Sequence, residues 1–140
     1  MKTQAWWFLV ALVVTSGSFA QCLKYAPEVV TLTGVVHLKT FYGPPGYGED
    51  PAHDRKERQA LLTLDQPLCV AKGLDDGLEE PEADQHEVTL VPLGAHPNLS
   101  SFRGKHVRVR GTFFHAITGH HHTALLLDVK NPSDIEALAQ

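Results

Sequence analysis

The sequence predicts an all-β protein, a small five-stranded barrel with one short helix, preceded by a cleaved signal peptide. Three observations predict it. β-Branched and apolar residues alternate along most of the chain, segments rich in Gly and Pro separate these runs, and one short apolar stretch stands at the N-terminus. An open sandwich of the same strands is the alternative architecture.

The first twenty residues have the pattern of a secretory signal peptide. Lys2 is the only charged residue in them, residues 5–14 are almost entirely apolar, and Ser18 and Ala20 are small residues at the positions that determine cleavage. No later segment approaches the ~18 consecutive apolar residues of a membrane span. We therefore expect residues 1–20 to be a signal peptide and residues 21–140 to form one exported domain, periplasmic or secreted, without a transmembrane span.

The charge and the cysteine content indicate which partners and which compartment to expect. The formal net charge is −4, and every acidic residue follows the first twenty positions. An acidic exported domain has no electrostatic basis for binding nucleic acid. Two cysteines, Cys22 and Cys69, predict one disulfide in an oxidising compartment.

Five strands and one helical turn are expected in the exported part. Residues 97–103 carry Leu99 and Phe102 on one side and end before Gly104, which predicts the helical turn. Residues 71–85 are rich in acids and are expected to form a solvated loop, and the tail after residue 131 to add a short helix. The strands are predicted at residues 28–41, 58–70, 87–91, 105–115 and 121–130.

The last two strands predict a hairpin register. Matching their apolar faces pairs Val107 with Val129, and therefore His115 with His121, around a turn at 116–120. Gly34 and Gly111 suit the strand bends of a small barrel. Together with the long loop at 42–57 and the helical turn before the fourth strand, this order resembles an OB-fold.

The chain also resembles a family of small exported bacterial proteins known as domain of unknown function 4431. The resemblance implies export and a compact β fold, and it implies no chemistry. It rests on residues 22–34 (CLKYAPEVVTLTG), 40–45 (TFYGPP), 67–70 (PLCV), 107–111 (VRVRG) and 118–123 (TGHHHT).

A histidine cluster is the most distinctive feature of the sequence. The predicted register places the imidazoles of His115 and His121 close enough to share a metal ion, and His120 is a candidate third ligand. Neutral imidazole suits zinc or copper. His122 and His53 are further candidates. The alternative is that these histidines are exposed residues or hydrogen-bond the long loop and hold it in place.

The OB-fold topology brings two of the predicted loops together. Loops 42–57 and 116–120 flank the ligand groove in that fold. Tyr42, Tyr47 and His120 are therefore candidate residues for binding a ligand or a partner protein.

Three functions are compatible with these features. The first is a non-catalytic binding or interaction module that uses the groove between the two loops, with another exported or envelope protein as a partner. The second is a transition-metal-binding protein, and the third is a metal-dependent hydrolase with Asp54 or Glu57 as base. The sequence contains no recognised catalytic motif, so we expect no enzymatic activity and assign no catalytic residue.

Overall fold

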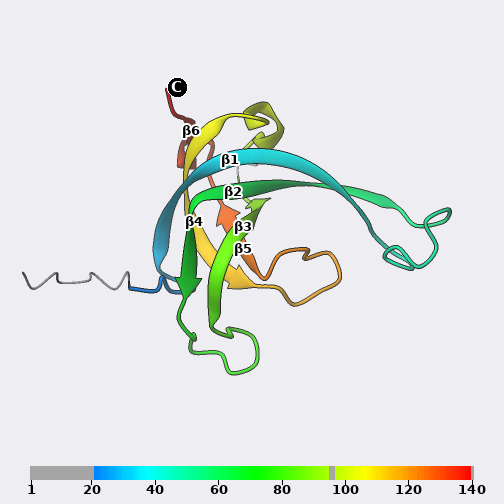
Figure 1. Cartoon of the computed structure of the whole chain (residues 1–140), viewed down its shortest axis with the longest axis horizontal. Coiled ribbons are helices and arrows are strands. Elements are labelled where there is room, and N and C mark those ends of the chain that lie inside the picture. The colour runs from blue at the N-terminus through cyan, green and yellow to red at the C-terminus, as the bar shows by residue number, and fades with distance from the viewer. Residues whose placement is uncertain (1–20, 95–96, 140) are drawn as a thin grey trace, which may run out of the picture.

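The computed structural model describes residues 21–94 and 97–139 and shows a closed β-barrel. The predicted signal peptide lies outside these residues. Six strands and two short 3-10 turns follow one another along the chain: β1 (Val29–Tyr42), β2 (Lys56–Val70), β3 (Glu82–Pro92), η1 (Leu99–Phe102), β4 (His106–His115), β5 (Leu125–Val129), η2 (Pro132–Asp134) and β6 (Ile135–Ala137) (Figure 1).

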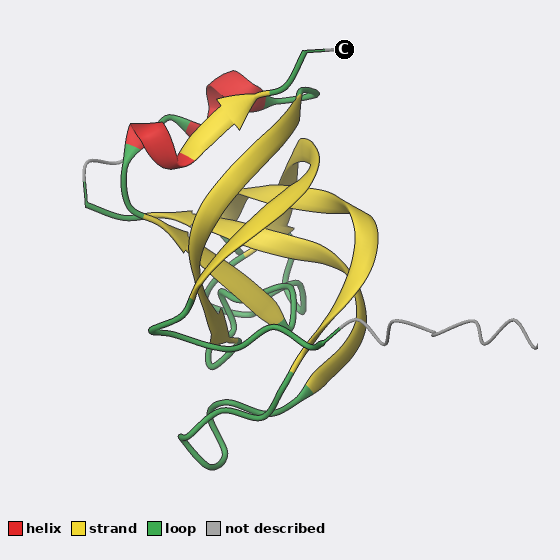
Figure 2. Cartoon of the chain, turned by 90° about the vertical axis from the view of Figure 1, so that its left-hand side faces the viewer, coloured by secondary structure: helices red, strands yellow, loops and turns green. Residues whose placement is uncertain are grey.

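Five of the strands close the barrel. Their order is β1-β2-β3-β5-β4, and β4 pairs back onto β1. The β3–β5 pair is parallel and the other pairs are antiparallel. This confirms the predicted OB-like barrel (Figure 2), and each of the five predicted strands overlaps an observed one, although β3 begins earlier and β5 later than expected. Among the described residues, no helix has the length and apolar character needed to cross a membrane.

The barrel interior holds the main core. Alternate residues of each strand point inward, as expected for pleated strands. Val36, Leu62, Val107 and Leu127 have no exposed surface, and Phe113 is the largest side chain among them at 1% exposed. Gly34 and Gly111 lie where neighbouring strands approach closely. A Cβ at Gly34 would collide with the carbonyl oxygen of Thr63, and a Cβ at Gly111 with that of Asp128.

A second buried cluster lies on the outer face of the barrel. Leu61, Thr89 and Leu126 are at most 2% exposed and belong to the opposite strand face from the core residues next to them. The loop between β4 and β5 covers them, since Thr123 Oγ1 accepts a hydrogen bond from Thr89 N at 3.1 Å. The outer face of β2, β3 and β5 is therefore not solvent-exposed at this point.

The disulfide is confirmed and attaches the N-terminal segment to the barrel. Cys22 and Cys69 are bonded, with their Cα atoms 4.8 Å apart. Leu23 N donates to Cys69 O at 2.9 Å, and the Tyr25 ring enters the core at 3% exposed. Residues 22–25 thus form part of the packed domain.

The predicted register of the last hairpin is wrong. His115 pairs with Leu125 and Phe113 with Leu127, a slip of four residues from the expected His115–His121 pairing. An even slip keeps the same residues on the apolar face, so matching faces does not distinguish the two registers.

The pairing partner of the first half of β4 explains the slip. Val109 lies opposite Ile135 of β6, a strand that the sequence did not predict. The expected terminal helix is only the 3-10 turn η2, and the expected turn at 116–120 becomes a loop over 116–124. The expected acidic loop is shorter than predicted, because β3 begins at Glu82.

The β1–β2 hairpin extends beyond the barrel as an arm. The pairing of β1 with β4 ends at Val35, and the pairing of β2 with β3 begins at Ala60. β1 and β2 nevertheless stay paired with each other as far as Tyr42 and Lys56. Figure 1 shows this arm projecting from the barrel, with the loop between β4 and β5 below it.

Candidate functional site

The tip of the arm is folded around one carboxylate. Asp54 is 8% exposed and accepts hydrogen bonds from Gly46 N at 2.6 Å and Gly48 N at 2.7 Å. Burial alone raises the pKa of Asp54, but these backbone donors and the nearby His53 outweigh it, and the pKa is lowered. Asp54 therefore organises the tip loop, and both of its oxygens are engaged.

The loop between β4 and β5 contacts the arm through His120. Its Nδ1 lies 2.7 Å from Glu57 Oε1, and its Nε2 lies 3.4 Å from the Tyr47 hydroxyl. Gln59 Nε2 donates to His120 O at 2.6 Å. The predicted meeting of loops 42–57 and 116–120 is thus present, and Tyr47 and His120 form part of it.

His122 covers the outer face of the arm. Its ring stacks on Phe41 with centroids 3.8 Å apart and planes inclined by 4°. Burial lowers the pKa of His122, an effect that the carboxylate of Glu57 opposes. The neutral imidazole therefore serves as a flat packing surface.

His121 is held as a hydrogen-bond acceptor. Its Nδ1 accepts from Ile117 N at 2.9 Å, and its ring packs edge-on against Phe114 at 5.5 Å. Burial, and then the charge of His120, lower the pKa of His121. Both effects favour the neutral imidazole, and the hydrogen bond from Ile117 N requires that Nδ1 be the nitrogen without a proton.

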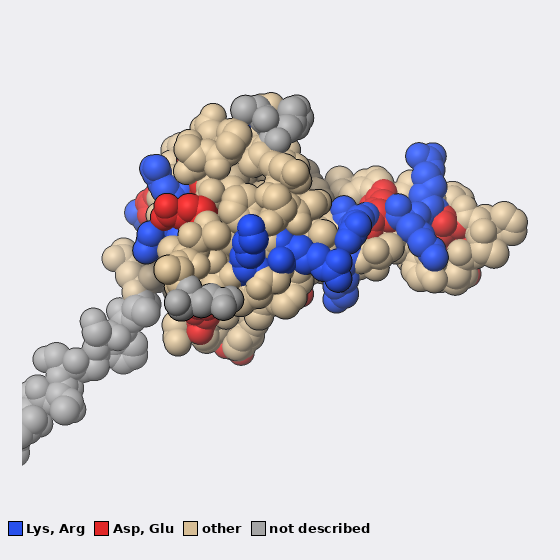
Figure 3. Space-filling model, turned by 90° about the horizontal axis from the view of Figure 1, so that it is seen from above, with Lys and Arg blue, Asp and Glu red and all other residues tan. Residues whose placement is uncertain are grey.

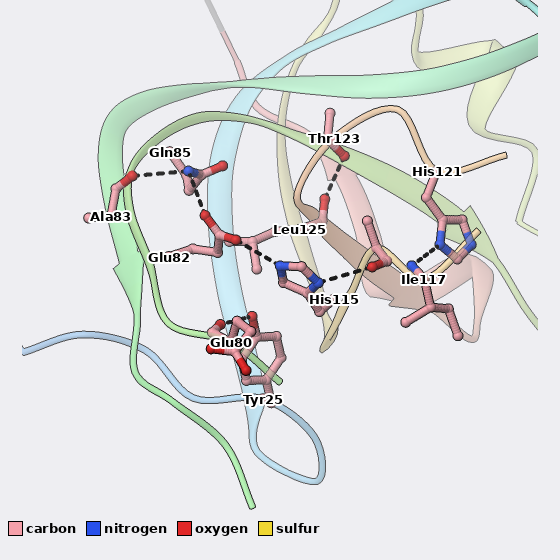
Figure 4. A network of polar contacts seen from close by, with 11 residues as sticks. Tyr25, Glu80, Glu82, Ala83, Gln85, His115, Ile117, His121, Thr123 and Leu125 are labelled. Carbon is pink, nitrogen blue, oxygen red and sulfur yellow. Dashed lines mark hydrogen bonds and ion pairs between the residues drawn. The ribbon is translucent and has the colours of Figure 1, made fainter. Parts of the chain in front are cut away.

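His115 lies on the other face of β4 from the loop histidines. Because neighbouring residues of a strand alternate between faces, His115 points away from the side where Phe114 meets His121. Its Nε2 lies 2.7 Å from Glu82 Oε1, and its Nδ1 lies 3.0 Å from Ala116 O (Figure 4). The imidazoles of His115 and His121 therefore do not face one another.

Tyr25 completes the surroundings of His115. The two rings meet edge-on at 6.4 Å, and the Tyr25 hydroxyl donates to Glu80 O at 2.6 Å. Burial, then the charges of Glu82 and other nearby acids, raise the pKa of Tyr25 to about 12. This network joins the N-terminal segment, β3 and the end of β4.

The expected metal ligands are distributed over separate contacts. His53 lies at the arm tip beside Asp50, 2.7 Å away, and is 79% exposed. Across residues 21–94 and 97–139, no group of three or more His, Cys, Asp or Glu side chains is arranged to hold a metal ion. The alternative reading of the histidines, that they hold the long loop in place, is the one that the contacts of His120 and His122 support.

A cavity of about 490 Å³ opens where the arm leaves the barrel. Leu38, Leu90 and Leu99 line it and belong to, or pack against, the main core. Arg58 and Ser100 are exposed side chains at its border. His120 and His121 also border it, whereas Tyr42 and Tyr47 do not.

Most of this cavity was not predicted from the sequence. Its walls come from β2, β3 and the segment 97–100, which the pattern identified only as ordinary strand and turn residues. Pro97 and Leu99 are buried beside it. One sequence signal could have predicted the cavity. The first two strands are longer than the third, which implies that they extend beyond the strand that pairs with them.

A second cavity of about 540 Å³ lies between the N-terminal segment and the loop after β2. Its lining includes Lys24, Glu28, Lys72 and Glu79, so charges of both signs surround it. Leu74 in its wall is fully exposed. Its wall is thus partly an exposed surface loop.

One family of known proteins resembles part of the chain. The family model described as a domain of unknown function (DUF4431) matches residues 87–136, which run from β3 to β6 and include the loop between β4 and β5 (residues 116–124, the histidine loop). No curated protein and no solved structure matches the chain. The match agrees with the resemblance noted in the sequence: this segment of the chain is similar to the DUF4431 family.

Proposed function

We propose that this protein is a non-catalytic binding module that takes its ligand or partner in the cavity between the arm and the barrel. The observation that carries the proposal is the cavity itself, about 490 Å³ in volume, lined by leucines that belong to or pack against the core and by polar groups at its border. A concave, mostly apolar site with a few convergent polar groups is the usual form of a binding pocket.

The histidine loop supports this proposal by its position. It forms one wall of the cavity through His120 and His121, and it is fixed to the arm by the Glu57 and Gln59 contacts. The wall is thus held in place before any ligand arrives. Preorganisation of this kind lowers the entropy cost of binding.

The contacts of the candidate bases favour binding over catalysis. Asp54 is engaged by two backbone amides and Glu57 by His120. Both carboxylates hold loops in position, and neither lines the cavity. The residues that line it supply surface and hydrogen bonds.

We also infer that the module works outside the cytoplasm. The Cys22–Cys69 disulfide supports this, because such bonds persist in oxidising compartments. The signal-like pattern of residues 1–20 supports the same inference. The test is to express the full chain in a bacterial host, follow its export by radiolabelling, and determine the N-terminal sequence of the protein. A protein that stays in the cytoplasm and retains Met1 contradicts the inference.

Binding of the fluorescent probe 1-anilinonaphthalene-8-sulfonate tests the proposed site. Ser100 is exposed at the border of the cavity, so Ser100→Phe is expected to fill part of it and weaken probe binding at least fivefold. Ser133→Phe makes the same change at an exposed position outside it and leaves the affinity unchanged. Equal affinity for all three proteins contradicts the proposed site.

A further inference from the structure

Along one edge of the arm, beside the cavity, the backbone has no strand partner among residues 21–94 and 97–139. The pairing of β2 with β3 begins at Ala60 and Leu90, so within this part of the chain Lys56–Gln59 pair with β1 alone. In an antiparallel strand, alternate residues direct their N–H and C=O groups to opposite sides. Half of the residues in this stretch therefore present free backbone groups on the side away from β1.

The cavity lies directly beside this open edge. Arg58, Gln59 and Ala60 line it on the β2 side, and Val91 and Pro92 line it on the β3 side. The two strands have separated there, and the space between them is bounded by the core residues Leu38 and Leu90. An extended chain entering this space meets free backbone groups and an apolar floor together.

The charge of the arm indicates what kind of chain fits. Lys39, Arg55, Lys56 and Arg58 make no ion pair within the described part of the protein. The nearby Glu57, by contrast, is already paired with His120. Figure 3 shows Lys and Arg side chains along much of the arm. Lys39 lies over the Phe41 ring, 5.2 Å from its centroid, so Arg55, Lys56 and Arg58 are the arm cations that lack a counter-ion among the described residues.

We infer that the occupant of the cavity is an extended acidic peptide segment of another exported protein, which pairs with the open edge of β2 as an added strand. This inference rests on the proposed function and specifies its partner. Main-chain hydrogen bonds to Lys56–Gln59 provide the affinity, and alternate apolar side chains of the peptide enter the cavity. Arg58 at the border meets a carboxylate of the peptide.

A peptide with alternating valine and glutamate, nine residues long and capped at both ends, is a suitable probe. Its N-methylated counterpart has the same side chains but lacks the N–H groups that an added strand needs. We expect N-methylation of alternate residues to weaken binding at least tenfold in fluorescence anisotropy. A peptide with lysine in place of glutamate is expected to bind more weakly than the valine–glutamate peptide by a similar factor.

Variants of the protein test the same contact from the other side. Arg58→Gln is expected to weaken binding of the valine–glutamate peptide about fivefold. Arg103→Gln removes the same charge from an exposed position outside the cavity and leaves binding unchanged. Hydrogen exchange of backbone amides within Lys56–Gln59 is expected to slow at least tenfold when the peptide is bound.

The outcomes separate this inference from the proposed function. Equal binding of the peptide and its N-methylated counterpart overturns strand addition. Binding of 1-anilinonaphthalene-8-sulfonate that is sensitive to Ser100→Phe, with no peptide binding, overturns the peptide and leaves the cavity as a binding site for another ligand. If neither the peptide nor 1-anilinonaphthalene-8-sulfonate binds, both the proposed binding site and its peptide occupant are overturned.

Discussion

Replacing His121 tests whether a neutral imidazole holds the loop between β4 and β5. His121 Nδ1 accepts a hydrogen bond from Ile117 N at 2.9 Å, which requires that Nδ1 carry no proton. His121→Leu removes the acceptor. His121→Asn keeps an oxygen at the same distance along the side chain, because Oδ1 of Asn and Nδ1 of His are both attached to Cγ.

The size of the effect follows from the character of this bond. It joins neutral partners near the surface, and a bond of this kind contributes about 1 kcal/mol net. Loss of the bond therefore increases the population in which the Ile117 amide is open by about fivefold. Burial lowers the pKa of His121 below its usual value of 6.5, so the unfolded chain takes up this proton at higher pH than the folded one. The bond is present above pH 6.5 and is lost as the pH falls through the lower pKa of the folded state.

Exchange of the Ile117 amide proton with water, measured by NMR and corrected for the intrinsic rate, reports this bond. At pH 7.5 we expect the wild type and His121→Asn to exchange at similar rates and His121→Leu about fivefold faster. At acidic pH the wild type approaches the Leu variant, whereas the Asn variant does not change. Equal exchange in the Leu and Asn variants at pH 7.5, or a wild-type rate that is independent of pH, refutes the reasoning.

Two further predictions concern stability. Cys22→Ser with Cys69→Ser opens a covalent loop of about 48 residues, and urea unfolding is expected to show a loss of about 4 kcal/mol; a loss below about 1 kcal/mol contradicts the expected constraint on the unfolded chain. Gly111→Ala places a Cβ against Asp128 O between β4 and β5. The free energy of unfolding in urea is expected to fall by about 1–3 kcal/mol. An unchanged urea midpoint would contradict this, because it would show that the two strands can move apart at this position.

Local patterns were sufficient to predict the barrel. The alternation in 28–41 corresponds to β1, and Val30, Leu32 and Val36 on its predicted apolar face are all buried. The disulfide followed from two cysteines and the expected compartment. The meeting of Tyr47 with His120 followed from topology, because the OB-like order fixes which loops lie at the same end of the barrel.

The features that the sequence did not predict correctly share a physical cause. The position of His115 depends on the pairing register of β4 with β5, and apolar faces match equally well after an even slip. That register depends on β6, a three-residue strand too short to show a period of its own. The cavity depends on where β2 separates from β3, which is a property of the assembled sheet.

Methyl NMR of the leucines, recorded while 1-anilinonaphthalene-8-sulfonate is added, tests the central claim most directly. Leu38, Leu90 and Leu99 line the arm cavity, and Leu74 lines the second cavity. We expect the methyl signals of the first three to shift together and saturably, and that of Leu74 to stay in place. Shifts confined to Leu74, or no saturable shift at the other three, contradict the assignment of the arm cavity as the binding site.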